Sequence, residues 1–329
     1  MRIGVLGRTE LLLQTARALA GAGHTIGVVG TSKAEDYYGV GVEDFARFAQ
    51  ETGADFFNTA RINDREIVQR LRDANCDVCI SLNWQTVAGP EACDAFPLGI
   101  YNVHAGDLPR FRGNAVINWA ILLGERRVGL CLHRMIPNEL DNGDILKKSF
   151  FDLTQDTYVG EVWNWILTET PKLAIAGFGS LADGSAKLEK QADDPALALR
   201  CYPRRPADDR IDWREPSWKI RRLIRASSRP YGGAFSMLEG KTKVSIWRAD
   251  EFAHAGPFVA IPGQILDRHE GDPIVACGEG ALRLTDVSLE GVRPASPSSG
   301  DESPSAETQP NYSKEAKETI TKSLRNRLI

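Results

Sequence analysis

The chain has 329 residues, 40 lysines and arginines against 44 aspartates and glutamates, and 42% hydrophobic residues. This is the composition of an ordinary globular protein with room for one large and one small domain, and the net charge of -4 argues against a general nucleic-acid binder. No apolar run reaches the ~18 residues that a membrane span needs, so membrane insertion is not expected.

Strands that are apolar along their whole length alternate with amphipathic helices in the first part of the chain. The expected strands are residues 2–7, 25–31, 54–59, 76–84, 99–104 and 128–135, and the expected helices between them are residues 11–24, 42–53, 64–75 and 114–125. This alternation predicts the α/β class: a Rossmann-like, mostly parallel sheet with helices on both faces.

The second part of the chain has a different composition. A long helical pattern over residues 157–184 closes the first region, and short alternating strands then predict a small β-barrel-like (OB-like) domain. Residues 293–310 are rich in Ser, Pro and Glu, which predicts disorder. The expected domains are a catalytic domain at 1–185, a linker at 186–200, the β domain at 201–292, and a disordered linker with a polar tail at 293–329.

The N-terminus and the cysteines both favour a reducing, cytoplasmic location. The first residues form a strand pattern with no signal-peptide pattern, and the six cysteines are scattered in mostly apolar segments. Cys76 and Cys79 form a single CxxC on an apolar strand with no second pair. We therefore expect these two thiols to pack as small hydrophobic side chains rather than to bind zinc.

The first strand ends without a dinucleotide fingerprint. Gly4 and Gly7 are three residues apart, nothing completes a GxGxxG pattern, and no acidic residue ends the second strand. A nicotinamide-dependent oxidoreductase, the main alternative within this fold class, is therefore disfavoured.

Polar residues cluster at the end of one expected strand, in YNVHAGDLPRFRG. Asn102 and His104 share a face of the strand, and ligands bind at the carboxyl ends of parallel strands. An amide that stabilises an oxyanion beside an imidazole that carries a proton suits acyl transfer. Asp141, in the loop after the next strand, is placed to reach the imidazole and raise its basicity. The residues alone leave open that Asn102 caps a turn and that His104 is merely a satisfied polar group.

Two further features have both functional and structural interpretations. His133 lies within an apolar strand, where a structural or substrate-edge position is favoured over a catalytic one. The arginine-rich run at residues 200–229 is either an RNA-contact patch or a solvated linker followed by a helix. Interspersed acidic residues favour the second interpretation.

The segments NVHAGDLPRFRG, NWAILLGE, GLCLHRM and LDNGD, in this order, resemble the formyltransferases that use 10-formyltetrahydrofolate. The likeness spans roughly residues 1–250 and includes the N-x-H, L-P-x-x-R-G and D-x-G patterns. It implies that a primary amine attacks the formyl carbon of the folate. Asn102 would then bind the oxyanion, His104 would move the proton, and Asp141 would orient His104, with no metal required.

The resemblance also implies binding residues. The folate would lie between the loop LNWQTVAG at residues 82–89 and the loop at residues 137–141. The implied folate-binding residues are Thr86, Val87, Ala88, Pro137, Asn138 and Leu140. The substrate-binding candidates are Trp84, Arg110, Arg112 and Arg134. Arginines suit a nucleotide diphosphate, although Arg112 is equally open as a scaffold residue that fixes the active-site loop.

The molecule that accepts the formyl group is the part of the predicted reaction that the sequence constrains least. Enzymes that act on methionyl-tRNA carry a basic loop after the second strand, whereas here that region, GTSKAEDYYGVGVEDF, has more acids than bases. Purine-pathway relatives are shorter and lack a second β domain. The sequence is most similar to sugar-nucleotide N-formyltransferases, in particular the domain that acts on UDP-4-amino-4-deoxy-arabinose.

This resemblance implies a nucleotide-linked amino sugar as the partner, for a surface polysaccharide such as lipopolysaccharide O-antigen, and a homodimer as an assembly that related enzymes form. Nucleic acid is disfavoured as a partner. Methionyl-tRNA formyltransferase is the alternative within the class, and a non-catalytic nucleic-acid module built on the barrel is an alternative outside it.

Overall fold

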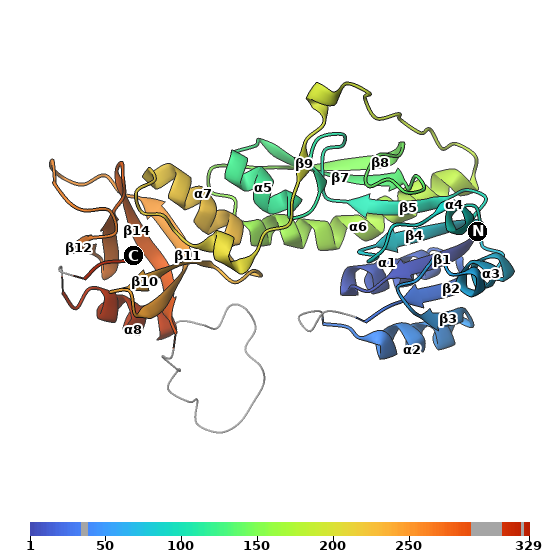
Figure 1. Ribbon diagram of the computed structural model, residues 1–329, viewed down its shortest axis with the longest axis horizontal. Helices are drawn as coiled ribbons and strands as arrows, with labels where there is room; N and C mark the ends of the chain where they lie inside the picture. Colours follow the sequence, from blue (N-terminus) through green and yellow to red (C-terminus); the bar gives the residue numbers. More distant parts are fainter. Residues whose placement is uncertain (34–38, 291–310, 324–325) are drawn as a thin grey trace. The chain divides into compact units, whose positions relative to one another are not determined.

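The computed structural model describes residues 1–33, 39–290, 311–323 and 326–329 (Figure 1). The chain divides into two compact units. Unit 1 comprises Met1–Val116, Arg127–Asp152 and Val162–Pro203, and unit 2 comprises Ile117–Arg126, Leu153–Glu161 and Arg204–Ile329. The domain limits expected from the sequence stay a proposal, and the expected disordered segment 293–310 lies outside the described residues.

Unit 1 is built on a seven-stranded sheet with the order β3-β2-β1-β4-β5-β7-β8. The strands are β1 Arg2–Gly7, β2 Thr25–Thr31, β3 Asp55–Asn58, β4 Val78–Leu82, β5 Ile100–His104, β7 Arg127–Arg134 and β8 Ile145–Asp152. The pairs from β3 to β5 are parallel, and β7 pairs antiparallel with both β5 and β8. The expected α/β class with a mostly parallel sheet is confirmed.

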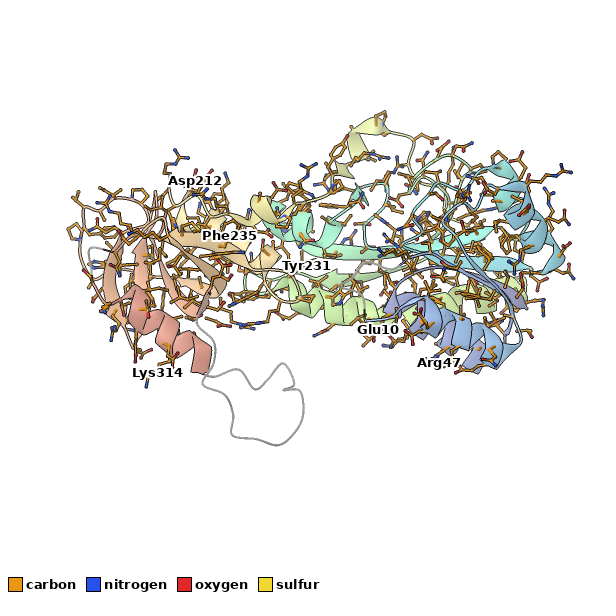
Figure 2. All side chains as sticks on the ribbon, turned by 60° about the horizontal axis from the view of Figure 1, so that its bottom comes forward. Glu10, Arg47, Asp212, Tyr231, Phe235 and Lys314 are labelled. Carbon is orange, nitrogen blue, oxygen red and sulfur yellow. The ribbon has the colours of Figure 1, made fainter. Side chains whose placement is uncertain are left out.

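Helices cover this sheet on both faces, as the burial of its strands shows. Every residue of the central strand β4 is buried. The helices of unit 1 are α1 Glu10–Gly21, α2 Val42–Thr52, α3 Arg65–Asp73, α4 Pro90–Cys93 and most of α6 Val159–Ala182, whereas residues 117–123 of α5 Val116–Leu123 belong to unit 2. Exposed charged side chains such as Glu10 on α1 and Arg47 on α2 lie on the outer helix faces (Figure 2). Among the described helices, none is both long and apolar enough to cross a membrane.

The edge strand β8 was not among the strands expected from the sequence. Its burial alternates after the first two residues, and it carries Lys147 and Lys148, so it lacks the continuous apolar run of the inner strands. Charged side chains of this kind are typical of edge strands, where they discourage pairing with another chain.

The two buried thiols of the CxxC behave as packing groups. Cys76 and Cys79 are both buried and unpaired. Burial raises the pKa of Cys76 to about 11 and that of Cys79 well above its ordinary value. Both therefore stay protonated thiols at neutral pH, as expected for side chains that act as small hydrophobes.

Gly7 is required by the close approach of two strands. It ends β1 opposite Leu82 of β4. A Cβ on Gly7 would lie 2.0 Å from the Leu82 carbonyl oxygen, and its φ of +151° disfavours any side chain. Backbone packing thus explains this glycine without a bound phosphate.

Gly7→Ala is expected to lower the free energy of unfolding by about 2 kcal/mol or more, because a backbone segment must move to make room. Chemical denaturation of the full chain measures the change. Gly21→Ala is the matched control: it ends α1, a Cβ there meets nothing within 4 Å, and alanine favours helix. Equal stability of the two variants would contradict the packing explanation.

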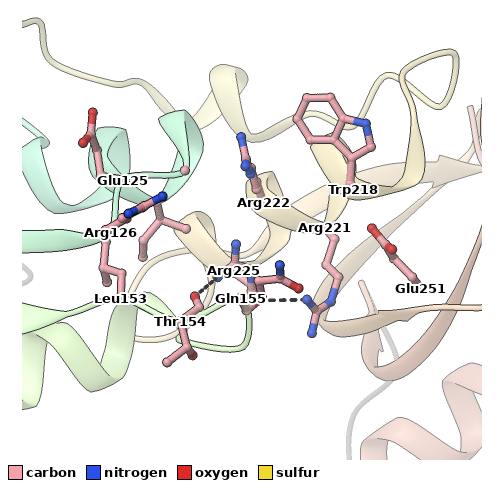
Figure 3. A pocket seen from close by; sticks show the side chains of 12 residues that line it. Glu125, Arg126, Leu153, Thr154, Gln155, Trp218, Arg221, Arg222, Arg225 and Glu251 are labelled. Atoms are coloured by element: carbon pink, nitrogen blue, oxygen red, sulfur yellow. Dashed lines mark hydrogen bonds between the residues drawn. The ribbon is translucent and has the colours of Figure 1, made fainter.

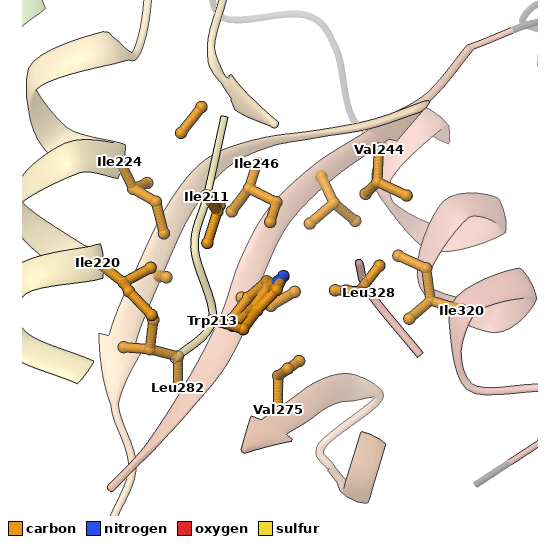
Figure 4. Close-up of a cluster of buried hydrophobic side chains, with 14 of the residues drawn as sticks. Ile211, Trp213, Ile220, Ile224, Val244, Ile246, Val275, Leu282, Ile320 and Leu328 are labelled. Atoms are coloured by element: carbon orange, nitrogen blue, oxygen red, sulfur yellow. The ribbon is translucent and has the colours of Figure 1, made fainter. Parts of the chain in front are cut away.

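Unit 2 contains a five-stranded antiparallel sheet with the order β10-β11-β14-β13-β12. Its elements are α7 Ser217–Ser227, β10 Ala234–Leu238, β11 Thr242–Glu251, β12 Ile265–His269, β13 Asp272–Ala276, β14 Ala281–Leu289 and α8 Asn311–Ile320. The expected small β domain is confirmed. Trp213 lies in its core and donates a hydrogen bond from Nε1 to Ser236 Oγ at 2.9 Å (Figure 4).

The C-terminal residues belong to this core. Ala316 and Ile320 on α8 and Leu328 beyond it are all buried in the cluster around Trp213 (Figure 4). Leu328 also pairs with Leu238 of β10. The described C-terminal residues have too little apolar surface to fold alone, but they add three side chains to the core of unit 2.

Candidate active site

The candidate site lies where β5 and β7 run side by side. Asn102 and His104 alternate with buried Val103 along β5, so they share a face of the sheet. Antiparallel pairing places His133 of β7 opposite Asn102. Asn102 Nδ2 and His133 Nε2 are 3.3 Å apart. The sequence analysis did not place His133 in the catalytic group, since the direction of β7 is not legible in its apolar pattern.

Asp141 completes the group from the loop that follows β7. Its Oδ1 lies 3.5 Å from His104 Nδ1 and 3.6 Å from His133 Nε2, so one carboxylate oxygen faces two imidazoles. Its Oδ2 accepts a hydrogen bond of 2.9 Å from the Gly113 N–H. The structure thus brings Asn102, His104 and Asp141 together and adds His133.

The electrostatics of the group favour a charged carboxylate and a neutral imidazole. Burial acts to raise the pKa of Asp141, but the facing imidazole of His133, the charge of His104 and the hydrogen bond from the Gly113 N–H together lower it to about 2. For His104, burial lowers the pKa and outweighs the opposing effect of Asp141. The sequence analysis expected Asp141 to raise the basicity of His104. Asp141 does act in that direction, but the net shift of the His104 pKa is downward because the residue is only 8% exposed.

Both nitrogens of His104 face acceptors. Nε2 lies 2.6 Å from the Phe111 carbonyl oxygen, and Nδ1 faces Asp141. A neutral imidazole has one N–H and can donate to only one of these oxygens, whereas the imidazolium donates to both. His104 is therefore neutral at rest, and its two nitrogens have acceptors that would stabilise the imidazolium.

The pKa of His104 is expected to lie below 6.5, the ordinary value for histidine. It should fall further in Asp141→Asn, because this substitution removes the negative charge that favours the imidazolium. NMR of the imidazole Cε1–H signals measures it, with His104→Gln used to assign the signal and exposed His254 as internal reference. A midpoint above 6.5 in the native chain would show that burial does not dominate, and a rise of the His104 pKa in Asp141→Asn would show that the Asp141 charge does not raise it.

Gln191 holds the loop that carries Asp141. It is 6% exposed, and its Nε2 donates to the carbonyl oxygens of Asp141 at 2.9 Å and Gly143 at 2.8 Å. Its Oε1 accepts from Arg112 at 2.7 Å. Arg112 therefore contacts the scaffold of the loop, which favours the scaffold role over a phosphate ligand. Gln191 lies in the expected linker, where no motif pointed to it.

Gln191→Leu is expected to lower kcat by about 10- to 100-fold with a smaller change in KM, because a loosened loop misplaces Asp141. Steady-state kinetics measure the split between kcat and KM. Gln191→Glu keeps an acceptor for Arg112 but cannot donate to the two carbonyls, so it should not restore kcat. Gln14→Leu, on the exposed face of α1, is the control. Full activity in Gln191→Glu would contradict the proposal that Gln191 positions the loop of Asp141.

The two expected walls of a folate pocket meet. The Asn138 N–H donates to the Ala88 carbonyl oxygen at 3.0 Å, which joins the loop after β4 to the loop after β7. Val87 is 37% exposed and Leu140 is 47% exposed, so each wall presents an apolar side chain. Pro137, next to Asn138, is partly buried.

The first wall is fixed by side-chain hydrogen bonds. Thr86 Oγ1 donates to the Ala60 carbonyl oxygen at 2.7 Å and accepts from Trp84 Nε1 at 3.0 Å. The Val87 carbonyl oxygen accepts from Asn63 Nδ2 at 2.9 Å. Trp84 also packs edge-on against Phe57, so it supports this wall rather than reaching out as a separate ligand.

The remaining arginine candidates are placed differently. Arg134 is paired with Tyr101, whose side chain points to the face opposite Asn102 and His104, and its guanidinium lies beside Gly99 at the start of β5. We therefore do not retain Arg134 as a substrate ligand. Arg110 is exposed, with its guanidinium 5.2 Å from the Phe111 ring. Over the described residues, no group of three or more His, Cys, Asp or Glu side chains has the arrangement of a metal site.

An amide, two imidazoles and a carboxylate therefore lie together where β5 ends beside β7, and comparison with known families specifies the class of protein. Residues 1–176 match the family model described as "Formyl transferase", and residues 204–300 match "Formyl transferase, C-terminal domain". The first match alone covers more than half of the 329 residues. The chain belongs to the formyltransferase family, whose members are N-formyltransferase enzymes.

Individual relatives differ in the substrate that their names state. The methionyl-tRNA formyltransferase of Coxiella burnetii is 30% identical over 300 residues, which cover 89% of this chain and 92% of that protein. The N-formyltransferase from Helicobacter canadensis, solved with folinic acid and dTDP-3-aminofucose, has a TM-score of 0.59 at 14% identity and covers 86% of this chain and 98% of that one.

A third similar protein is HypX from Aquifex aeolicus, solved with tetrahydrofolic acid. It has a TM-score of 0.57 at 17% identity, and the match covers 88% of this chain but only 44% of the HypX chain. At such low identity, the two solved structures show that the fold is shared.

Proposed function

We propose that this enzyme transfers a formyl group from 10-formyltetrahydrofolate to the primary amine of a nucleotide-linked amino-deoxy sugar. One observation carries the chemistry: in a member of the formyltransferase family, Asp141 faces His104 beside Asn102 at the end of β5. An amide donor, an imidazole and a carboxylate are the groups that acyl transfer to an amine requires.

The residues divide the reaction between them. The amine nitrogen bonds to the formyl carbon, the carbonyl oxygen becomes an oxyanion, and the bond from that carbon to the folate nitrogen then breaks. The amide of Asn102 has two N–H groups: one faces His133 Nε2, and the other is free to donate to the oxyanion. Neutral His104 accepts the proton that the amine loses, and the folate nitrogen takes it up. Asp141 stabilises the imidazolium in between.

The formyl donor is supported by the paired loops and by the neighbours. Val87 and Leu140 offer apolar contacts for a flat ring on walls that the Asn138 to Ala88 hydrogen bond joins. The solved neighbours from Helicobacter canadensis and Aquifex aeolicus were obtained with folinic acid and tetrahydrofolic acid. We assign Thr86, Val87, Ala88, Pro137, Asn138 and Leu140 to the folate pocket on this basis.

A sugar nucleotide is the acceptor we favour. The region after β2, residues 30–45, contains one lysine against four acidic residues, which gives no basic loop for a tRNA backbone. The match to the Helicobacter canadensis neighbour, which was solved with dTDP-3-aminofucose, covers 98% of that protein's chain. Exposed Arg110 is the arginine that remains as a candidate for the diphosphate.

Methionyl-tRNA is the second candidate acceptor, and two observations favour it. The Coxiella burnetii methionyl-tRNA formyltransferase matches over 92% of its length, so both units of this chain have counterparts in it. Its identity of 30% is also higher than that of the sugar-modifying structural neighbour.

A substrate panel distinguishes the two acceptors. The full chain is incubated with 10-formyltetrahydrofolate and either UDP- or dTDP-linked 3-amino and 4-amino sugars, or methionyl-tRNA. We expect a mass increase of one formyl group on a sugar nucleotide, detected by mass spectrometry, and no formylation of the tRNA. Asn102→Ala is the catalytic control and should lose on the order of 100-fold or more in rate.

The outcomes separate the parts of the proposal. Formylated methionyl-tRNA as the only product would overturn the sugar acceptor and keep the chemistry. Near-normal turnover by Asn102→Ala would remove its role as oxyanion donor. No transfer to any amine in the panel, with folate binding intact, would overturn both acceptors.

A further inference from the structure

A cavity of about 420 Å³ lies wholly within unit 2, whereas Asn102, His104 and Asp141 belong to unit 1. Its walls come from α7, from residues 121–126 and 153–155, and from Glu251 at the end of β11 (Figure 3). Its volume is in the range of sites for small ligands.

Four arginines line this cavity: Arg126, Arg221, Arg222 and Arg225. Arg221 is neutralised, because its Nη2 lies 2.6 Å from Asp156 and 3.4 Å from Asp250. Within the part of the chain that the structure describes, Arg126, Arg222 and Arg225 have no carboxylate oxygen within 4.0 Å. Three guanidiniums therefore face one cavity without a direct counter-ion.

Arg225 is the most costly of these charges to bury. It is 6% exposed, and its Nη1 donates to the carbonyl oxygens of Thr154 at 3.2 Å and Thr157 at 2.9 Å. Its Nε is buried and, among the described atoms, has no hydrogen-bond partner. Burial lowers the pKa of Arg225, and the nearby charge of Arg221 lowers it further. Carbonyl dipoles alone offset a buried cation poorly, so an anion in the cavity would stabilise it.

Two glutamates also contribute to the walls, and their positions leave the middle of the cavity cationic. Glu125 lies on the same side as Arg126, and Glu251 lies on the far side beyond Arg221 (Figure 3). Arg222 and Arg225 lie between them (Figure 3). The attraction for an anion is therefore local, although the walls carry both signs of charge.

Trp218 adds an apolar surface to this cationic region. Its side chain is 48% exposed, and the guanidinium of Arg222 lies 4.9 Å from the centre of its ring. An arginine held on an aromatic face keeps its in-plane N–H groups available, and guanidinium forks match phosphate oxygens in pairs. The arginines and the tryptophan together suit a ligand that has both phosphate groups and a flat ring.

We propose that this cavity binds a diphosphate-bearing small molecule, with Arg126 and Arg222 as ligands of the phosphate oxygens and Trp218 as a surface for an attached base. Such a ligand can be inorganic pyrophosphate or a nucleoside diphosphate. The site is separate from the catalytic group in unit 1, and the proposal does not depend on which acceptor is formylated.

Isothermal titration calorimetry of the full chain with pyrophosphate, UDP and uridine, at about 0.15 M salt, tests the proposal. Pyrophosphate and UDP should bind and uridine should not, because the guanidiniums bind the phosphates. Arg126→Gln and Arg222→Gln should each raise Kd by about 10-fold. Arg214→Gln is the control, since Arg214 belongs to the same unit, is 83% exposed and should leave Kd unchanged.

Tryptophan fluorescence locates the bound molecule. Ligand binding should change the emission, and Trp218→Phe should remove that change. Tighter binding of UDP than of pyrophosphate would identify a nucleoside diphosphate as the ligand class, and the reverse would identify pyrophosphate. Absence of saturable binding, or a Kd that neither Arg126→Gln nor Arg222→Gln alters in folded protein, would overturn the proposal. Binding lost only in Arg110→Gln would assign the diphosphate to unit 1 and overturn it as well.

Discussion

The candidate active site depends on one carboxylate oxygen that faces two imidazoles. Oδ1 of Asp141 lies 3.5 Å from His104 and 3.6 Å from His133, and these rings come from adjacent strands. A buried carboxylate would normally be costly, because desolvation favours its neutral form. Here its partners outweigh burial and lower its pKa to about 2. The aspartate is therefore charged at neutral pH and can stabilise an imidazolium.

The surrounding structure supplies the geometry that this carboxylate needs. The Gly113 N–H binds its second oxygen, and Gln191 binds the backbone of its loop at Asp141 and Gly143. Arg112 holds Gln191 in turn. The network ties the loop after β5, the loop after β7 and the segment beyond α6 to one another, so three distant parts of the chain fix a single side chain. A connected network of hydrogen bonds of this kind favours one arrangement of a buried polar group.

The two units stabilise buried charge by different means. Asp141 in unit 1 has two imidazoles and a backbone N–H close by, and its charged form is favoured. Arg225 in unit 2 has two carbonyl oxygens and a like charge nearby, and its charged form is disfavoured. The first arrangement already favours the charged form, whereas the diphosphate proposed for unit 2 would offset the charge of Arg225.

Part of this organisation is determined by the sequence itself. Continuous apolar runs alternating with helical patterns specify a mostly parallel sheet, since only strands buried on both faces have that composition. The two-residue spacing of Asn102 and His104 places both on one face of a strand, because side chains alternate along extended backbone. Their order with the later D-x-G at Asp141 is enough to identify the family.

Tertiary structure alone decided the remaining positions. His133 lies beside Asn102 and Asp141, and its neighbour Arg134 lies on the opposite face, because of the register in which β7 pairs with β5; a strand buried on both faces has the same apolar pattern in any register. Gln191 meets Arg112 across 79 residues, and Leu328 enters the core of unit 2 beside Trp213. These contacts join segments far apart in the chain, and local patterns of hydrophobicity and spacing contain no information about which distant segment a side chain will meet.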